Sequence, residues 1–208
     1  MMKKFLIKKL LILALALLLT GCSSGYAHNS VKGLGQPIQK KASGQIKLEL
    51  DDYEFVISKL YSYDITALVL STHNYNGFSV DDKLSPRDFA LGWGKLAEIN
   101  DQHDFHWSQS GRWYHWKMDS WDEANAIGGT QVVSYNSANN HIIPADETVR
   151  TLIKTVKVGE CVHMKGYLVN IDGMKSDGRD FHWHSSTTRE DSGGGSCEVF
   201  YVESIEWK

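Results

Sequence analysis

Hydrophobic and polar positions alternate through much of the chain, which is the pattern of β-strands that bury one face. The alternation starts in residues 46–50, repeats in residues 53–57 and continues through the β-branched stretch 63–75. Two aromatic strands joined by a turn at Gly111 are expected next. The last three alternating runs are separated by turn residues and predict a meander over residues 158–173, 178–186 and 197–208.

Two helices are predicted from their first turns. Ser120 and Glu123 form a capping box, and Gly128 with Gly129 would end the helix that follows. Asp146 is placed to cap the amphipathic stretch 148–156.

Two other stretches are assigned from weaker signals. Ser85-Pro86 resembles a cap and a first-turn proline, which predicts a short helix within residues 87–99. Residues 131–135, with the sequence QVVSY, are predicted to be a strand.

The composition is that of one globular domain. The chain has 208 residues, of which 42% are hydrophobic and 23% are charged, so disordered, collagen-like and repeat-array proteins are excluded. The expected fold class is α+β and β-rich, with a twisted antiparallel sheet or a partly closed OB-like barrel and two or three short helices. The glycine spacing from Gly159 to Leu168 resembles the opening strand of OB-type barrels.

The amino terminus predicts export. Residues 1–21 have a basic head and a short apolar core, which is the form of a signal peptide and is too short for a spanning helix. The string Leu19 to Cys22 resembles the lipobox of bacterial lipoproteins, in which the cysteine is acylated. An ordinary cleaved signal with an incidental cysteine is the alternative.

This resemblance implies a cellular location and a domain organisation. Cys22 would insert its acyl chains into the bilayer, and Ser23 favours the outer membrane with the protein on its periplasmic face. The polar stretch 22–44 is expected to be a flexible lipidated stalk, and residues 45–208 the single globular domain.

The charge of the mature chain disfavours nucleic-acid partners. Removing the four lysines of the signal from 22 basic residues leaves 18 against 25 acidic ones, so the net charge becomes −7. Binding to phosphates requires clustered Lys and Arg, which this chain lacks. No cofactor motif is present.

Two cysteines remain after lipidation. In an oxidising compartment an even remainder predicts a disulfide between Cys161 and Cys197. Two buried free thiols are the alternative.

The histidines carry a second hypothesis. His182 and His184 are two residues apart on a predicted strand and share a face, as metal ligands often do, and His163 could supply a third ligand. A metal-dependent hydrolase would then use Glu190 or Asp191 as its base. The alternative is that these rings are solvated or singly hydrogen-bonded.

A binding patch is the other functional hypothesis. Four tryptophans crowd between residues 107 and 121, but no complete catalytic constellation is visible in the sequence. The expected function is therefore non-enzymatic binding of an envelope protein or another envelope component, or a structural role in the envelope, through loops that carry Trp107, Trp113, His141, Trp183 and Arg189.

Several segments together resemble a family of exported bacterial proteins that share the patterns S-P-x-D-x-A-x-G-W-G, N-x-H-x-I-P-A and T-R-x-D-x-G-x-G-x-C-E. The matching segments lie between residues 60 and 206. No activity comes with this resemblance. It implies that cysteine is usual at Cys197 while the position of Cys161 is usually aliphatic, so a role of Cys197 would need no disulfide partner.

Overall fold

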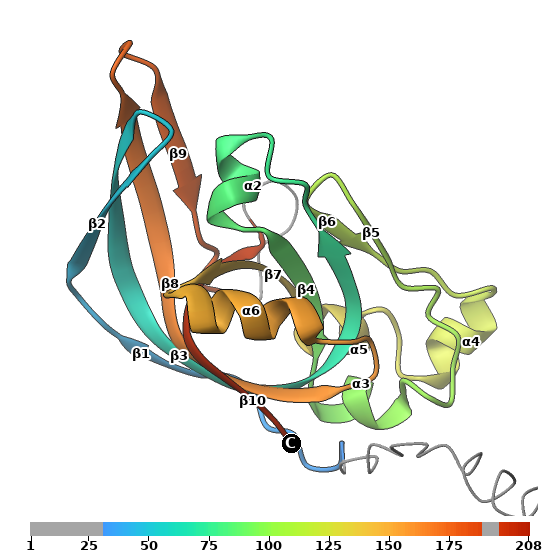
Figure 1. Ribbon diagram of the computed structural model, residues 1–208. Helices are drawn as coiled ribbons and strands as arrows, with labels where there is room; N and C mark the ends of the chain where they lie inside the picture. The colour runs from blue at the N-terminus through green and yellow to red at the C-terminus, as the bar shows by residue number, and fades with distance from the viewer. Residues whose placement is uncertain (1–30, 189–195) are drawn as a thin grey trace, which may run out of the picture.

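The computed structural model describes residues 31–188 and 196–208, and it is β-rich with five short helices in that part of the chain (Figure 1). The strands are β1 (Ile38–Lys41), β2 (Gln45–Leu50), β3 (Tyr53–Asn74), β4 (Arg87–Gly92), β5 (Ser108–Ser110), β6 (Trp113–His115), β7 (Ser137–Pro144), β8 (Cys161–Lys175), β9 (Asp180–His184) and β10 (Glu198–Trp207). The helices are α2 (Val80–Leu84), α3 (Gly94–Ile99), α4 (Trp121–Ala126), α5 (Gln131–Tyr135) and α6 (Glu147–Thr155).

Five strands close into a ring. β3 pairs with β4, β4 with β7, β7 with β10, β10 with β8, and β8 with β3 again. All of these contacts are antiparallel except that between β7 and β10. The strands thus form a partly closed barrel whose pairing order resembles that of five-stranded OB-type barrels, and the predicted α+β, β-rich fold class is confirmed. The Gly159–Leu168 segment lies at β8, the fourth strand of the barrel and not its opening strand.

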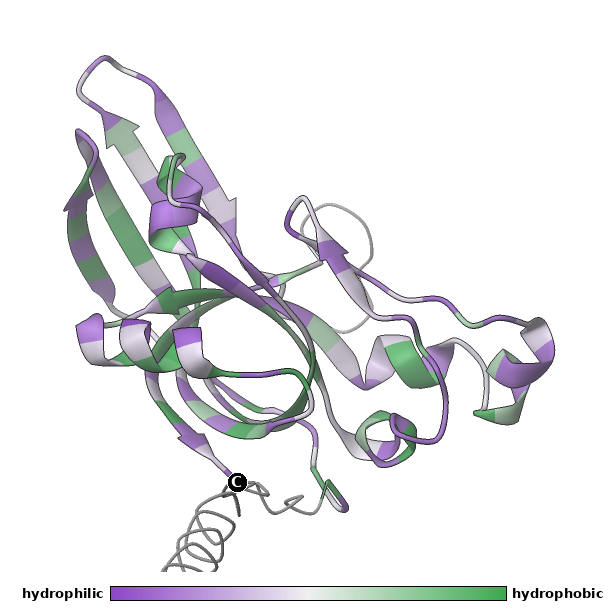
Figure 2. Ribbon diagram, turned by 45° about the vertical axis from the view of Figure 1, so that its right-hand side comes forward, coloured by the Kyte–Doolittle hydropathy of each residue, from purple (hydrophilic) through white to green (hydrophobic). Residues whose placement is uncertain are grey.

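The barrel interior is filled by alternate side chains of all five strands. Tyr63 and Ile65 of β3 meet Phe89 of β4, Met164 of β8 and Phe200 of β10 in one buried cluster. Helix α6 adds its apolar face to the same cluster, and its first turn is capped by the Asp146 carboxylate as predicted. Figure 2 shows the resulting division, with the polar side of α6 turned outward.

The long strands extend beyond the barrel. The first part of β3 and the last part of β8 continue as a sheet flanked by β2 and β9 (Figure 1). β10 pairs with β8 and not with β9, so the predicted meander is wrong at its last step. Strand β9 is thereby left on the outer side of the barrel, where it faces the site described below.

Tertiary pairing overrides two local predictions. Residues 87–92 form the strand β4, which is paired on both edges and buried on both faces, and the helix begins only at Gly94. A strand buried on both faces has no alternation, which removes the signal that separates it from a buried helix. Residues 131–135, predicted to be a strand, are the helix α5.

The segment between β4 and β7 leaves the barrel and packs on its outer surface. It contains α3, α4, α5 and the β5–β6 hairpin, whose turn at Gly111 and Arg112 has φ angles of 57° and 69°. The predicted hairpin is therefore confirmed. Ser120 caps α4 by accepting a hydrogen bond from the Glu123 amide, as the capping box predicts.

The amino-terminal boundary of the domain is earlier than predicted. Leu34 packs on the barrel core, the indole of Trp93 donates a hydrogen bond to Gln36, and β1 pairs with β3. Residues 34–44 therefore belong to the folded domain, because these contacts attach them to the barrel. The predicted signal and the stalk up to residue 30 lie outside the described residues. Among the residues that the structure describes, no helix is both long enough and apolar enough to cross a bilayer.

The two cysteines do not form the predicted disulfide. Both are free and buried. Cys161 lies beside Lys208 at the end of β10, whereas Cys197 directly precedes the start of that strand. The register of β8 against β10 thus places the two thiols at opposite ends of the 10-residue strand β10.

Candidate functional site

A buried group of polar side chains lies on the outer face of the barrel, where β4 and β7 run side by side. Asp88 of β4 and His141 of β7 are direct cross-strand partners. The carboxylate of Asp88 lies 2.9 Å from His141 Nδ1, and it accepts hydrogen bonds from the Tyr75 hydroxyl at 2.9 Å and from the Ser85 hydroxyl at 3.2 Å. Asp88 is only 1% exposed.

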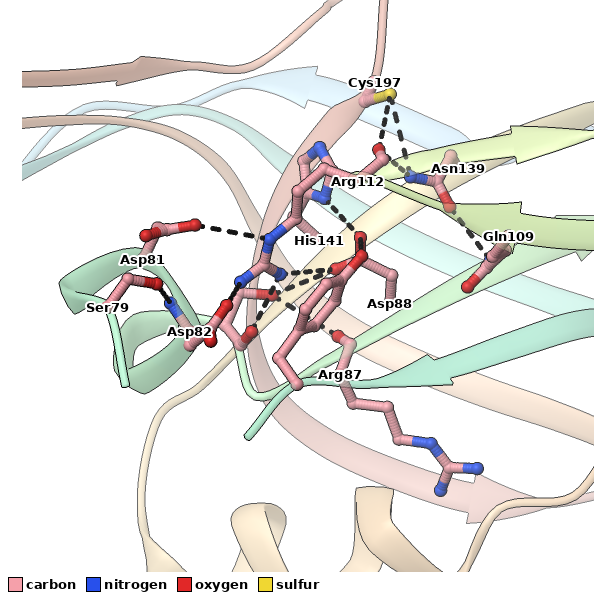
Figure 3. A network of polar contacts seen from close by, with 12 residues as sticks. Ser79, Asp81, Asp82, Arg87, Asp88, Gln109, Arg112, Asn139, His141 and Cys197 are labelled. Atoms are coloured by element: carbon pink, nitrogen blue, oxygen red, sulfur yellow. Dashed lines mark hydrogen bonds and ion pairs between the residues drawn. The ribbon is translucent and has the colours of Figure 1, made fainter. Parts of the chain in front are cut away.

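Arg112 closes this group from above (Figure 3). Its Nη1 donates to Asp88 Oδ1 at 3.0 Å and its Nη2 donates to Asp82 Oδ1 of α2 at 2.9 Å. The guanidinium carbon lies 3.4 Å from the centroid of the Tyr75 ring. We call Tyr75, Ser85, Asp88, Arg112 and His141 the Asp88 network. The tight hairpin turn is what brings Arg112 over the barrel wall.

The network sets the charge of its members. Burial lowers the pKa of His141, but the hydrogen bonds with Asp88 and Cys197 and the charge of Asp88 outweigh burial and raise it to about 9. Burial and the adjacent Asp88 charge also raise the pKa of Tyr75, which keeps its hydroxyl protonated as a donor. At neutral pH the site therefore contains an imidazolium beside a buried carboxylate.

Cys197 lies next to this network. Its Sγ is 3.7 Å from Asn139 Nδ2 and 3.9 Å from the backbone carbonyl of Arg112, and it is one of the groups that raise the pKa of His141. Asn139 and His141 are two residues apart on β7 and share a face, while the parallel pairing of β10 with β7 brings Cys197, just before β10, level with Asn139.

An open pocket lies directly above these side chains. Its volume is about 390 Å³, and it is lined by Arg112, Trp113, His141, His182, Trp183, His184 and Cys197. The Trp183 ring packs on His141 with a centroid separation of 4.8 Å. Polar groups from the barrel wall thus form the floor, and the hairpin and β9 supply aromatic and imidazole walls.

The histidines of β9 cluster with a carboxylate instead of with His163. His182 Nδ1 and His184 Nε2 lie 2.7 and 2.8 Å from the same oxygen of Asp172. The hydrogen bonds that His182 donates to Asp172 and Asp180 raise the pKa of its ring. His163 instead pairs with Asp64 on the barrel, so the predicted triad of His163, His182 and His184 is wrong. The Asp172, His182 and His184 ligand atoms all lie within 4.8 Å of one another.

The structure brings together three of the five predicted binding residues. Trp113, His141 and Trp183 line the pocket. Trp107 does not, because it stacks between Phe105 and Tyr114 in the core beneath the hairpin. Arg189, like the candidate bases Glu190 and Asp191, lies outside the described residues.

Sequence reasoning missed Asp88, Arg112 and Asp172, because single charged residues in separate segments carry no local signal of convergence. A retrospective signal does exist for the floor of the pocket. Asp88, His141 and Cys197 each come from a different one of the three patterns on which the family resemblance depends. Comparison with known proteins adds no relative, since no family model, no curated protein and no solved structure matches this chain.

Proposed function

We propose that this chain is a lipid-anchored lipoprotein of the bacterial outer membrane that binds a sugar-bearing component of the cell envelope in this pocket. The observation that carries the proposal is the Asp88 network beneath an open, aromatic-walled pocket. Burying an aspartate, an arginine and a histidine together is costly unless each is held by partners. Packing of the barrel alone does not require such a buried ionic network. The network holds the side chains at the bottom of the pocket in place, where they would contact a ligand.

The choice of a sugar follows from the walls and from the charge. The rings of Trp113 and Trp183 offer faces for stacking, and Trp113 is 39% exposed. OB-type barrels bind oligonucleotides or oligosaccharides at the face of their second and third strands and at the adjoining loops, which here are β4, β7 and their neighbours. By analogy of fold, the same face would hold the ligand here. The acidic composition disfavours the nucleic acid.

Replacing a pocket tryptophan should abolish most of the binding. We expect soluble cell-wall glycan fragments to quench tryptophan fluorescence, and Trp183→Leu to weaken their binding about tenfold or more, because a central aromatic contact contributes roughly 2 kcal/mol. Trp121→Leu is the matched control, since Trp121 is 78% exposed on α4 and does not line the pocket. Equal affinity of both variants, or no quenching by the glycan, would contradict the proposed site.

The anchor is tested separately. Radiolabelled palmitate should enter the wild-type chain in cells and fail to enter the Cys22→Ala variant, because the acyl chains require that thiol. An unprocessed amino terminus in the mass spectrum of the wild type would overturn the anchoring.

A second candidate is a metal-dependent hydrolase. The observation that favours it is the cluster of Asp172, His182 and His184, two imidazoles and a carboxylate of the kind that binds Zn²⁺. We expect zinc binding measured by calorimetry to weaken at least tenfold in His184→Ala. His163 is hydrogen-bonded to Asp64 on the barrel, away from this cluster, so His163→Ala should bind zinc as the wild type does. Zinc affinity that is equal in the two variants would exclude this site.

A further inference from the structure

We infer that Cys197 is a nucleophile that takes an acyl group from an ester, with His141 as its acid–base partner and Asp88 as the residue that orients His141. The inference rests on the proposed pocket but extends it from binding to chemistry. A Cys, His and Asp brought together from separate segments are the parts that nucleophilic acyl transfer requires.

The contacts have the order of a catalytic triad. Asp88 Oδ2 lies 2.9 Å from His141 Nδ1, so the carboxylate fixes the ring and leaves Nε2 as the nitrogen available to the thiol. Cys197 is one of the groups that raise the pKa of His141, and both residues line the pocket. Tyr75, Ser85 and Arg112 in turn hold Asp88, so the orienting carboxylate is itself fixed from three sides.

Asn139 supplies a donor at the site of attack. Its Nδ2 donates to the Arg112 carbonyl at 3.0 Å and approaches Cys197 Sγ at 3.7 Å, while its Oδ1 accepts from Gln109 at 3.1 Å. The amide is therefore oriented by contacts on both ends. One of its hydrogens is available near the sulfur, where an oxyanion would form on an attacked carbonyl.

The acyl transfer and the hydrolysis that follows need only the ester and water. Where the His141 ring is neutral, the proton of the Cys197 thiol passes to it as the sulfur attacks the ester carbonyl carbon, and a C–S bond forms as the C–O bond to the alcohol breaks. His141 returns the proton to the departing alkoxide oxygen. Water then attacks the thioester with His141 as base, so a carboxylic acid leaves and the thiol is regenerated.

Cys161 provides an internal comparison. It is 5% exposed at the other end of β10, where burial raises the pKa of its thiol. Cys197 contacts the Asn139 amide and the Arg112 carbonyl at the edge of the pocket that His141 also lines. A cysteine that only filled core volume would have surroundings like those of Cys161 and no polar partners.

The experiment uses the purified full chain in detergent and p-nitrophenyl acetate as the ester. We expect a burst of about one nitrophenolate per chain and, by peptide mass mapping, one acetyl group on Cys197 and none on Cys161. Cys197→Ala should abolish the burst, and His141→Gln should slow acylation about a hundredfold or more, which is the usual contribution of a general acid–base group.

The remaining outcomes decide against the inference. Acetyl found on other residues, no acetyl on Cys197, or an unchanged acylation rate in His141→Gln would overturn it. Peptide mass mapping of the acetylated wild-type chain tests the role of Cys197 without any substitution. The inference therefore stays testable even if His141→Gln misfolds. Glycan quenching measured on the wild-type chain separates the two proposals, because quenching without acetylation of Cys197 would keep the binding pocket and overturn only the chemistry.

Discussion

Replacing Asp88 by Asn is expected to lower the free energy of unfolding by about 3–5 kcal/mol, because removing one member of a buried ionic group leaves its partners uncompensated. Arg112 would lose its buried carboxylate and His141 its only charged partner on β4, while the asparagine retains the size of the side chain. Urea unfolding followed by tryptophan fluorescence measures the change.

The same substitution should alter the pH dependence of stability. A folded-state pKa of about 9 for His141, against about 6.5 in the unfolded chain, gives stabilisation that is complete below pH 6.5 and is lost as the pH rises towards 9. The loss over this interval would be about 3 kcal/mol. In Asp88→Asn this decline should largely disappear. The other ionisable groups around His141 are Cys197, Arg112, His182 and His184, and they are retained in both chains.

Asp81→Asn is the matched control for both measurements. Asp81 also faces Arg112, at 3.6 Å from Nε, but its side chain is 39% exposed. Exposed ion pairs contribute about 0–1 kcal/mol, so this variant should unfold close to the wild type and keep its pH dependence. An Asp88→Asn chain as stable as Asp81→Asn would show that the network has no energetic role.

Gly166→Ala is expected to destabilise the barrel by about 3 kcal/mol or more, which is at the upper end of overpacking effects. A Cβ at this position would lie 1.9 Å from the Tyr201 carbonyl oxygen, a backbone atom that cannot move without shifting β10. The register of β8 and β10 changes at this point, between Val202 and Ser204. Glycine therefore lets the two strands approach closely where the barrel bends.

The control for this variant is Gly35→Ala. A Cβ there meets no atom within 4 Å, and the backbone is not in the left-handed region. Its free energy of unfolding, measured in urea, should stay within about 0.5 kcal/mol of that of the wild type. If Gly166→Ala unfolded at the same urea concentration as Gly35→Ala, the close approach of β8 to β10 would not be a constraint on the fold.

Much of the architecture could be predicted from local patterns. Alternation identified β2, β3 and β8, and the caps at Ser120 and Asp146 marked α4 and α6. These signals succeed because a period of two or a side chain that accepts from an amide three residues later is contained within a short window of sequence.

Only the tertiary structure decided the rest. β4 is a strand because β3 and β7 pair with its two edges, and such pairing leaves no trace in residues 87–92. The register of β10 separates Cys161 from Cys197, and the barrel instead places Cys197 beside His141 and Asp88. Alternation and helix caps involve residues that are close along the chain, so the sequence shows them directly. The pocket is formed by strands that are distant along the chain, and closure of the barrel determines which of them become neighbours in space.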